Sequence, residues 1–244
     1  MDKMDIVICV GPKDREILRQ MIPFTKKNIL NYRNIYLICS PPCIDIDGTI
    51  SIDETQFMFS KSEISAIIKN SSRVGWYLQQ LLKLYAGFCI PDLLENYLVI
   101  DSDTFFLKPT LFLKDDQPIF TTGSEYHVPY FDHMIKLHPN LKKVIKSSGI
   151  AHHMVFNKKR VQSLFSLVEN FHKREGDFWK IFLENIDPRF IQNSGASEYE
   201  IYFSFNLLYF PNLLHVRNLN WVNSNSINSK NKQCDYVSIH WYLR

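Results

Sequence analysis

The stretch Tyr97-Leu98-Val99-Ile100-Asp101-Ser102-Asp103 decides the class of fold. Its uninterrupted apolar run is typical of an interior strand that is covered on both faces. Two carboxylates one residue apart follow the run directly, and ligands of open α/β sheets bind just past the carboxyl ends of such strands. Mg²⁺ and Mn²⁺ prefer oxygen ligands and are commonly held by one or two carboxylates together with substrate phosphates. The stretch therefore predicts an α/β fold with a divalent-metal site for a diphosphate at the sheet edge.

Strands and helices are expected to alternate along the rest of the chain, which favours a Rossmann-like, mostly parallel central sheet flanked by helices. Helices are predicted from about Asp14, over 76–85 and over 158–168, and Asp14 is expected to cap the first of them. An Asn- and Ser-rich tail, 218–232, is expected to loop over the surface before a closing segment at 236–241. The other predicted strands are 6–10, 34–39, 55–59, 118–122 and 152–157.

The composition indicates one domain with a sizeable core. The chain has 244 residues, of which 45% are hydrophobic and 14% aromatic, and no linker divides it. Its longest apolar segments are shorter than the roughly 20 residues that span a bilayer. The residues from Met1 to Asp5 lead directly into a strand pattern and lack the features of a signal peptide. We therefore expect no membrane span and a cytoplasmic location, in the host cytoplasm if the source is viral.

Charge and cysteine usage exclude further classes of protein. A net charge of +3 is too small to indicate nucleic-acid binding, and five cysteines without short paired spacings predict neither disulfides nor a zinc site. The middle of the chain is nonetheless locally basic. We interpret it as a solvated helix face, with a negatively charged acceptor or a membrane surface as the alternative. Its basic residues are Lys136, Lys142, Lys143, Lys146, Lys158, Lys159 and Arg160.

Four segments, in this order along the chain, resemble motifs of glycosyltransferases with the GT-A fold. The segment 97–109 is similar to their DxD segment, whose aspartates bind a divalent metal that bridges the diphosphate of a nucleotide sugar. Over most of its length the chain resembles a poorly characterised bacterial and viral glycosyltransferase-like family. The other three segments are Gly75-Trp76-Tyr77-Leu78-Gln79-Gln80-Leu81-Leu82-Lys83, Ser197-Glu198-Tyr199-Glu200 and Ser238-Ile239-His240.

The resemblance implies a single GT-A-like domain over residues 1–244, with a donor-binding half up to about residue 110 and an acceptor-binding half from about 111 onward. It implies transfer of a sugar from a UDP-sugar to a hydroxyl of a glycan or glycoconjugate, with Mn²⁺ or Mg²⁺ as cofactor. Asp101, Asp103 and His240 are then the metal ligands, with the direct bond on Asp103 and a shared role for Asp101. Imidazole is compatible with Mn²⁺, although a lone histidine often only packs.

The donor site is expected to draw on several segments. The end of the first strand, Val10 and Gly11, is placed to contact the base and ribose through backbone groups. The resemblance adds Arg73, Gln80 and Lys83, for which the alternative is an ordinary polar position on an amphipathic helix. Gln80 and Lys83 lie three residues apart and share one face of that helix. Asp101 and Ser102 complete the predicted donor set.

Ser197-Glu198-Tyr199-Glu200 is typical of a helix start, with Ser197 as the cap and Glu200 in a capping box. That assignment makes Glu200 structural and leaves Glu198 as the catalytic candidate. An inverting transferase needs a carboxylate to take the proton of the acceptor hydroxyl, and a helix N-terminus tends to keep such a carboxylate ionised. We therefore predict inversion with Glu198 as the base.

The acceptor side is expected around residues 149–154. His152 and His153 are adjacent, and because neighbouring strand residues face opposite ways, one histidine is expected to face the sugar. Tyr126, Tyr130 and Trp221 have rings suited to stacking on a sugar, with plain packing as the expected alternative.

Two other classes of function stay open. One is a metal-dependent hydrolase or nucleotidyltransferase that acts on nucleotide sugars, and the other is a non-catalytic sugar-binding module. The sequence has no G-x-G-x-x-G fingerprint and no phosphate loop ending in Gly-Lys-Ser/Thr, which argues against a dinucleotide dehydrogenase and a P-loop enzyme.

Overall fold

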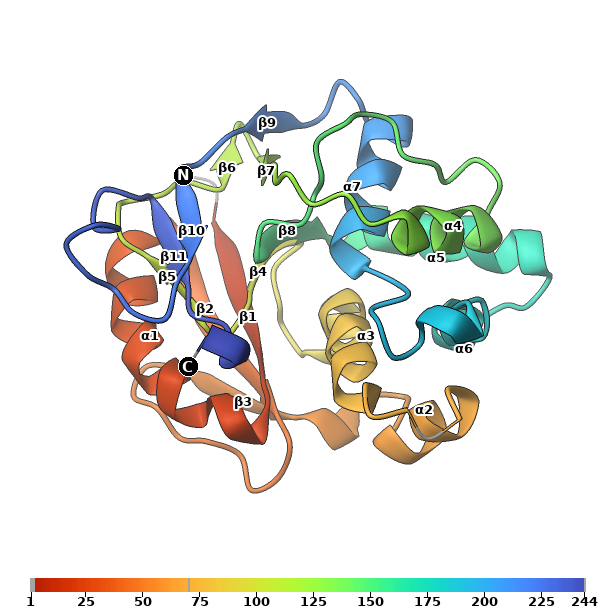
Figure 1. Cartoon of the computed structure of the whole chain (residues 1–244), viewed down its shortest axis with the longest axis horizontal. Helices are drawn as coiled ribbons and strands as arrows, with labels where there is room; N and C mark the ends of the chain where they lie inside the picture. Colours follow the sequence, from red (N-terminus) through yellow and green to blue (C-terminus); the bar gives the residue numbers. More distant parts are fainter. Residues whose placement is uncertain (1–2, 70, 244) are drawn as a thin grey trace.

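A computed structural model describes residues 3–69 and 71–243, and its centre is a five-stranded sheet (Figure 1). The strand order is β3-β2-β1-β4-β8. The first four strands are parallel, and β8 runs antiparallel to β4. The predicted α/β class, with a mostly parallel central sheet between helices, is therefore confirmed. The strands are β1 (Met4–Val10), β2 (Tyr32–Cys39), β3 (Ile50–Asp53), β4 (Asn96–Ile100) and β8 (His153–Asn157).

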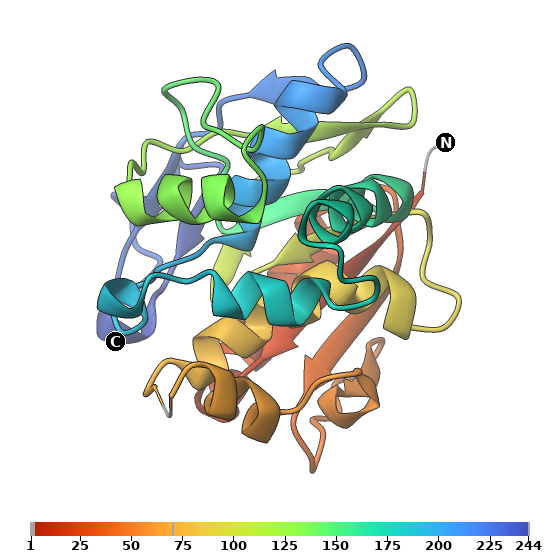
Figure 2. The same ribbon diagram turned by 90° about the vertical axis from the view of Figure 1, so that its right-hand side faces the viewer.

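Every residue of β1 and β4 is buried, because helices cover both faces of the sheet. Val7 and Cys9 of β1 pack into the core that contains α3 (Val74–Cys89) and α5 (Lys158–His172). The alternate residues of β1 pack on the other face, against α1 (Arg15–Asn28). Figure 2 shows α3, α5 and α6 (Phe178–Glu184) in front of the sheet. The period-two alternation of the strand thus builds two cores from one apolar run.

Two small sheets complete the fold. One has the order β10-β11-β5 and joins Trp221–Asn223 and Tyr236–Ser238 to Thr104–Phe106. The other has the order β6-β7-β9 and is made of Leu113–Lys114, Gln117–Thr121 and His215–Arg217. The remaining helices are α2 (Lys61–Ile67), α4 (Val128–Leu137) and α7 (Glu198–Tyr209), with single 3₁₀ turns at Pro12–Asp14, Glu54–Gln56, Pro188–Phe190 and Trp241–Leu243. In the part of the chain that the structure describes, no helix combines the length and the apolar character needed to cross a bilayer.

Two sequence predictions about these elements are wrong. The third strand is Ile50–Asp53 and not 55–59, because Asp53 accepts a hydrogen bond from the backbone N–H of Thr55 and so starts a 3₁₀ turn. The lysines at 142, 143 and 146 lie in the loop after α4 and not on a helix face. Local composition resembles a strand or helix in both places, but side-chain hydrogen bonds and packing determine the backbone there.

Candidate active site

A cavity of about 550 Å³ opens at the carboxyl end of β4, where α3, α7 and the C-terminal segment meet. An adjoining cavity of about 280 Å³ lies at the carboxyl end of β1 and shares Arg73 with the first. The smaller cavity is lined by Val10 and Gly11. The larger one brings together the other predicted residues, Gln80, Lys83, Asp101, Ser102, Asp103, Glu198 and His240. Segments more than one hundred residues apart therefore line one continuous site.

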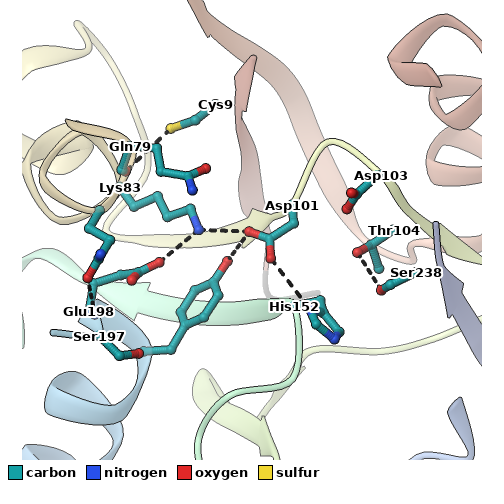
Figure 3. A network of polar contacts seen from close by, with 12 residues as sticks. Cys9, Gln79, Lys83, Asp101, Asp103, Thr104, His152, Ser197, Glu198 and Ser238 are labelled. Carbon is teal, nitrogen blue, oxygen red and sulfur yellow. Dashed lines mark hydrogen bonds and ion pairs between the residues drawn. The ribbon is translucent and has the colours of Figure 1, made fainter. Parts of the chain in front are cut away.

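A buried lysine joins two carboxylates at the centre of the larger cavity (Figure 3). The ammonium of Lys83 lies 2.7 Å from Oδ1 of Asp101 and 2.7 Å from Oε1 of Glu198. The phenol of Tyr199 also donates to Oδ1 of Asp101, at 2.9 Å. The side chains of Lys83 and Glu198 are 4% and 5% exposed, whereas that of Asp101 is 24% exposed. Two charged hydrogen bonds at this depth hold α3, β4 and α7 in one arrangement.

The surroundings shift the pKa values of the two carboxyl groups in opposite directions. Burial by itself lowers the pKa of Lys83, but the charges of Asp101 and Glu198 raise that pKa well above its ordinary value. Burial raises the pKa of Asp101, but Lys83 and His152 outweigh it and hold that pKa well below its usual range. For Glu198, burial is the larger effect, and its pKa is raised although Lys83 opposes the shift. Asp101 is therefore the firmly ionised partner and Glu198 the stronger base.

The raised pKa of Glu198 differs from the expectation that a helix N-terminus keeps this carboxylate readily ionised. Glu198 is the first residue of α7, but burial outweighs the helix terminus. Its backbone N–H donates to Oε1 of Gln80, at 3.0 Å. That bond orients the Gln80 amide and leaves Nε2 buried, with no hydrogen-bond partner among the described residues. The Nε2 amide of Gln80 is therefore able to donate hydrogen bonds to a polar ligand.

Asp103 and His240 are brought together by strand pairing. Strand β11 runs antiparallel to β5, with Ser238 opposite Thr104, and the N–H of Ile239 donates to the carbonyl of Asp103 at 2.9 Å. Nδ1 of His240 then lies 3.5 Å from Oδ2 of Asp103. Such a separation is longer than a hydrogen bond, and both groups line the cavity.

A second such pair lies beside the first. Nδ1 of His152 is 3.6 Å from Oδ2 of Asp101, and the rings of His152 and His240 are 4.6 Å apart between centroids. Within residues 3–69 and 71–243, no three His, Cys, Asp or Glu side chains already converge as the ligands of one ion. A metal that is bound with a nucleotide needs only one or two protein carboxylates beside the phosphates, so the two carboxylates and His240 fit that kind of centre. Their oxygen and imidazole donors suit Mn²⁺.

Arg73 lies where the two cavities meet. Its guanidinium stacks on the ring of Trp76, 4.5 Å from the centroid, and donates to Oγ of Ser194 at 2.8 Å. Its Nε atom is buried without a hydrogen-bond partner among the described residues. A planar guanidinium with unused donors between two cavities is suited to bind a phosphate group.

The capping residues around the site are partly as predicted. Ser197 caps α7, accepting from the N–H of Glu200 at 3.3 Å. The carboxylate of Glu200 does not return to the cap but binds Lys143, Ser148 and Gly149, so it anchors the preceding loop. Glu200 therefore has a structural role, as expected, but it anchors this loop and does not complete a capping box. Asp14 takes the N-cap position of α1, but its side chain makes no capping hydrogen bond and lines both cavities.

Residues 17–208 match a family of unknown function, DUF6492. The chain belongs to this family. Among solved structures, mouse xyloside xylosyltransferase 1 in its apo form is similar over 100% of this chain and 99% of that chain, with a TM-score of 0.48 and 9% sequence identity. No curated protein matches the sequence. The function of this DUF6492 member must therefore be inferred from its own site.

The sequence assigned no role to Tyr199 of this DUF6492 protein, and it did not decide which of His152 and His153 faces the sugar. His152 has a left-handed backbone, φ 62°, which is uncommon for a residue other than glycine, and sequence spacing gives no signal of it. The turn sends His152 into the cavity, while Nε2 of His153 binds Oγ1 of Thr121 at 2.9 Å in the core. The two histidines thus lie in different surroundings, as expected.

Two of the three aromatic residues expected near the acceptor line the larger cavity. Tyr130 and Trp221 line the cavity, and Trp221 stacks on Tyr236. Tyr126 is 65% exposed, and its ring packs on Phe131 of α4.

Proposed function

We propose that this protein is a metal-dependent glycosyltransferase that moves a sugar from a UDP-sugar to a hydroxyl of a glycan or glycoconjugate. The observation that carries the proposal is the buried bridge from Lys83 to Asp101 and Glu198, beside Asp103 and His240. This bridge unites an ionised aspartate at a strand end with a carboxylate of raised pKa. An inverting transferase that uses nucleotide sugars employs both, one for the diphosphate end of the donor and one for the acceptor proton.

The nucleotide is assigned to the smaller cavity. Val10 and Gly11 end β1 there and offer backbone groups to a base and ribose. Arg73 lines both cavities, so a diphosphate beside it extends from the nucleoside into the larger cavity. Phosphate binding by a stacked arginine is common because its planar donors match phosphate oxygens. UDP as the nucleotide follows from the resemblance to GT-A enzymes.

Asp103 and His240 are assigned as the direct ligands of Mn²⁺ or Mg²⁺. Lys83 and Tyr199 both bind Oδ1 of Asp101, so we assign the shared metal contact of Asp101 to Oδ2. When bound, the ion supplies charge neutralisation for the departing diphosphate. Ser102, between the two aspartates, lines the same cavity and is assigned to the donor.

Glu198 is assigned as the base that takes the proton of the acceptor hydroxyl as that oxygen attacks the anomeric carbon. Lys83 engages Oε1, and we assign the proton to Oε2. The raised pKa supports this role, because proton transfer is most efficient when the pKa of the base approaches the working pH. Direct attack by the acceptor gives inversion at the anomeric carbon.

The deciding experiment measures binding and slow hydrolysis of a panel of nucleotide sugars, with and without Mn²⁺. We expect metal-dependent binding of one UDP-sugar by the wild type and its loss in Asp103→Ala. Asp45→Ala, which removes an exposed carboxylate from the loop between β2 and β3, is the matched control and should bind as the wild type does. No binding across the panel contradicts the proposal and favours a sugar-binding module. Rapid hydrolysis that no acceptor diverts favours a hydrolase. Formation of a nucleoside triphosphate and a sugar 1-phosphate when pyrophosphate is added favours a nucleotidyltransferase.

A further inference from the structure

Exposed apolar side chains are frequent just before α4, on α4 and on the loop that follows it. Five large ones fall within residues 126–145, although exposed apolar side chains are usually scattered singly on soluble proteins. The loop folds back beside α4 in both views of the molecule (Figures 1 and 2). The five residues are Tyr126, Val128, Ile135, Val144 and Ile145, with exposed fractions of 65%, 52%, 48%, 46% and 37%.

The loop also carries positive charge at its tip. Lys142 and Lys146 are exposed and flank Val144 and Ile145, and residues 138–148 contain no acidic residue. Lys143 is turned inward, where its ammonium lies 2.7 Å from Oε1 of Glu200. The acidic residues nearest in sequence are Glu125 and Asp132, on the α4 side, and Lys136 of α4 lies 3.8 Å from Asp187. The loop tip therefore presents two aliphatic side chains between two solvated lysines.

Hydrogen bonds with α7 and with the segment before α4 hold the loop in place. Glu200 of α7 accepts hydrogen bonds from Lys143, from the hydroxyl of Ser148 and from the N–H of Gly149. The backbone of Gly123 pairs with that of Ser148 in both directions. Because the loop is already anchored, little conformational entropy is lost when Val144 and Ile145 contact a partner.

We propose that residues 126–146 dock this protein on an anionic lipid surface. Val144 and Ile145 enter the headgroup region, and Lys142 and Lys146 contact the lipid phosphates. Apolar side chains flanked by lysines are what a peripheral protein uses on such a surface. A soluble polyanion would engage the lysines but would leave the apolar side chains in water, so the lipid surface accounts for more of the observations.

The position of this surface has a consequence for the acceptor. Glu125 and Tyr130 line the larger cavity, and they lie next to Tyr126 and within α4. A protein docked through residues 126–146 holds this side of the cavity close to the membrane. An acceptor attached to a lipid then reaches the site without leaving the bilayer surface. Docking itself is independent of the proposed transferase activity.

The test is sedimentation with lipid vesicles, with no sugar present. We expect the wild type to bind phosphatidylcholine vesicles that contain phosphatidylglycerol, to bind pure phosphatidylcholine much less, and to lose binding as salt rises. Each lysine near an anionic surface contributes about a fivefold gain in affinity, so Lys142→Gln/Lys146→Gln should lower the partition coefficient by about 25-fold. Val144→Ser/Ile145→Ser should lower it by about tenfold or more.

Leu213→Ser/Val216→Ser is the matched control, because these side chains are 47% and 46% exposed, just before and within β9. Because neither residue belongs to the proposed docking segment, 126–146, this variant should bind as the wild type does, and the melting temperature of each variant checks that it is folded. Equal binding of the wild type to both kinds of vesicle overturns the proposal. So does wild-type affinity in both loop variants, because another surface then makes the contact. Because binding to vesicles requires neither donor nor metal, the result of this test stays valid if the transferase proposal fails.

Discussion

Removing the ammonium of Lys83 tests the electrostatic centre of the site directly. Lys83→Met keeps the length of the side chain but leaves Asp101 and Glu198 without their shared counter-charge. Breaking a buried ion pair in this way costs about 3–5 kcal/mol. Asp101 is 24% exposed, so solvent screens part of its charge, and we expect the lower end of the range, about 3 kcal/mol at neutral pH. A domain of this size typically has about 5–15 kcal/mol of stability, so the variant should still fold.

The loss should depend on pH in a defined direction. In the wild type the pKa of Asp101 is depressed, so its contribution is present above the unfolded value of about 3.9 and is lost as pH falls below it. In the variant, burial without Lys83 raises the pKa of both carboxyls above their unfolded values. Such groups cost stability as pH rises above about 4, and this cost is absent when they are protonated. The difference between wild type and variant should therefore shrink from neutral pH towards about pH 4.

Urea unfolding followed by tryptophan fluorescence measures both quantities. Lys142→Met, which removes an exposed lysine, is the control and should change stability by less than about 0.5 kcal/mol. Adding Glu198→Gln to Lys83→Met should restore part of the loss, because one of the two stranded charges is gone. A loss below about 1 kcal/mol at neutral pH, or an equal loss at neutral and acid pH, would refute the reasoning about the bridge.

The remaining predictions concern catalysis and the backbone. Glu198→Gln should lower turnover about 100-fold or more while donor binding, measured by calorimetry, is preserved, whereas full activity would remove Glu198 as the base. His152→Gly should unfold at a higher temperature than His152→Ala, by the equivalent of about 1–2 kcal/mol, because alanine keeps the strain of a left-handed residue and glycine relieves it. The reverse order in thermal unfolding would show that His152 does not hold that backbone conformation in solution.

Local patterns in the sequence were sufficient for the main elements. The run Leu98 to Ile100 is a buried central strand, and Asp101 and Asp103 follow its end, because apolar runs and strand termini are local properties of the chain. The helix around Trp76 to Tyr85 and the cap at Ser197 were predicted for the same reason. The strand expected at 55–59 failed because one side-chain hydrogen bond from Asp53 redirects the backbone, and composition does not reveal such a bond.

The site itself combines both kinds of information. The sequence by itself determined which polar residues were candidates, since Lys83, Asp101 and Glu198 each stand at a position that local pattern or resemblance marks. Only the tertiary structure decided that one lysine bridges the two carboxylates, that β11 pairs with β5 and brings His240 to Asp103, and that His152 turns into the cavity. Periodicity and capping depend on neighbours in the chain and can be read from it. Strand partners, burial and the pKa shifts that follow depend on packing between distant segments, and so appear only when the chain is folded.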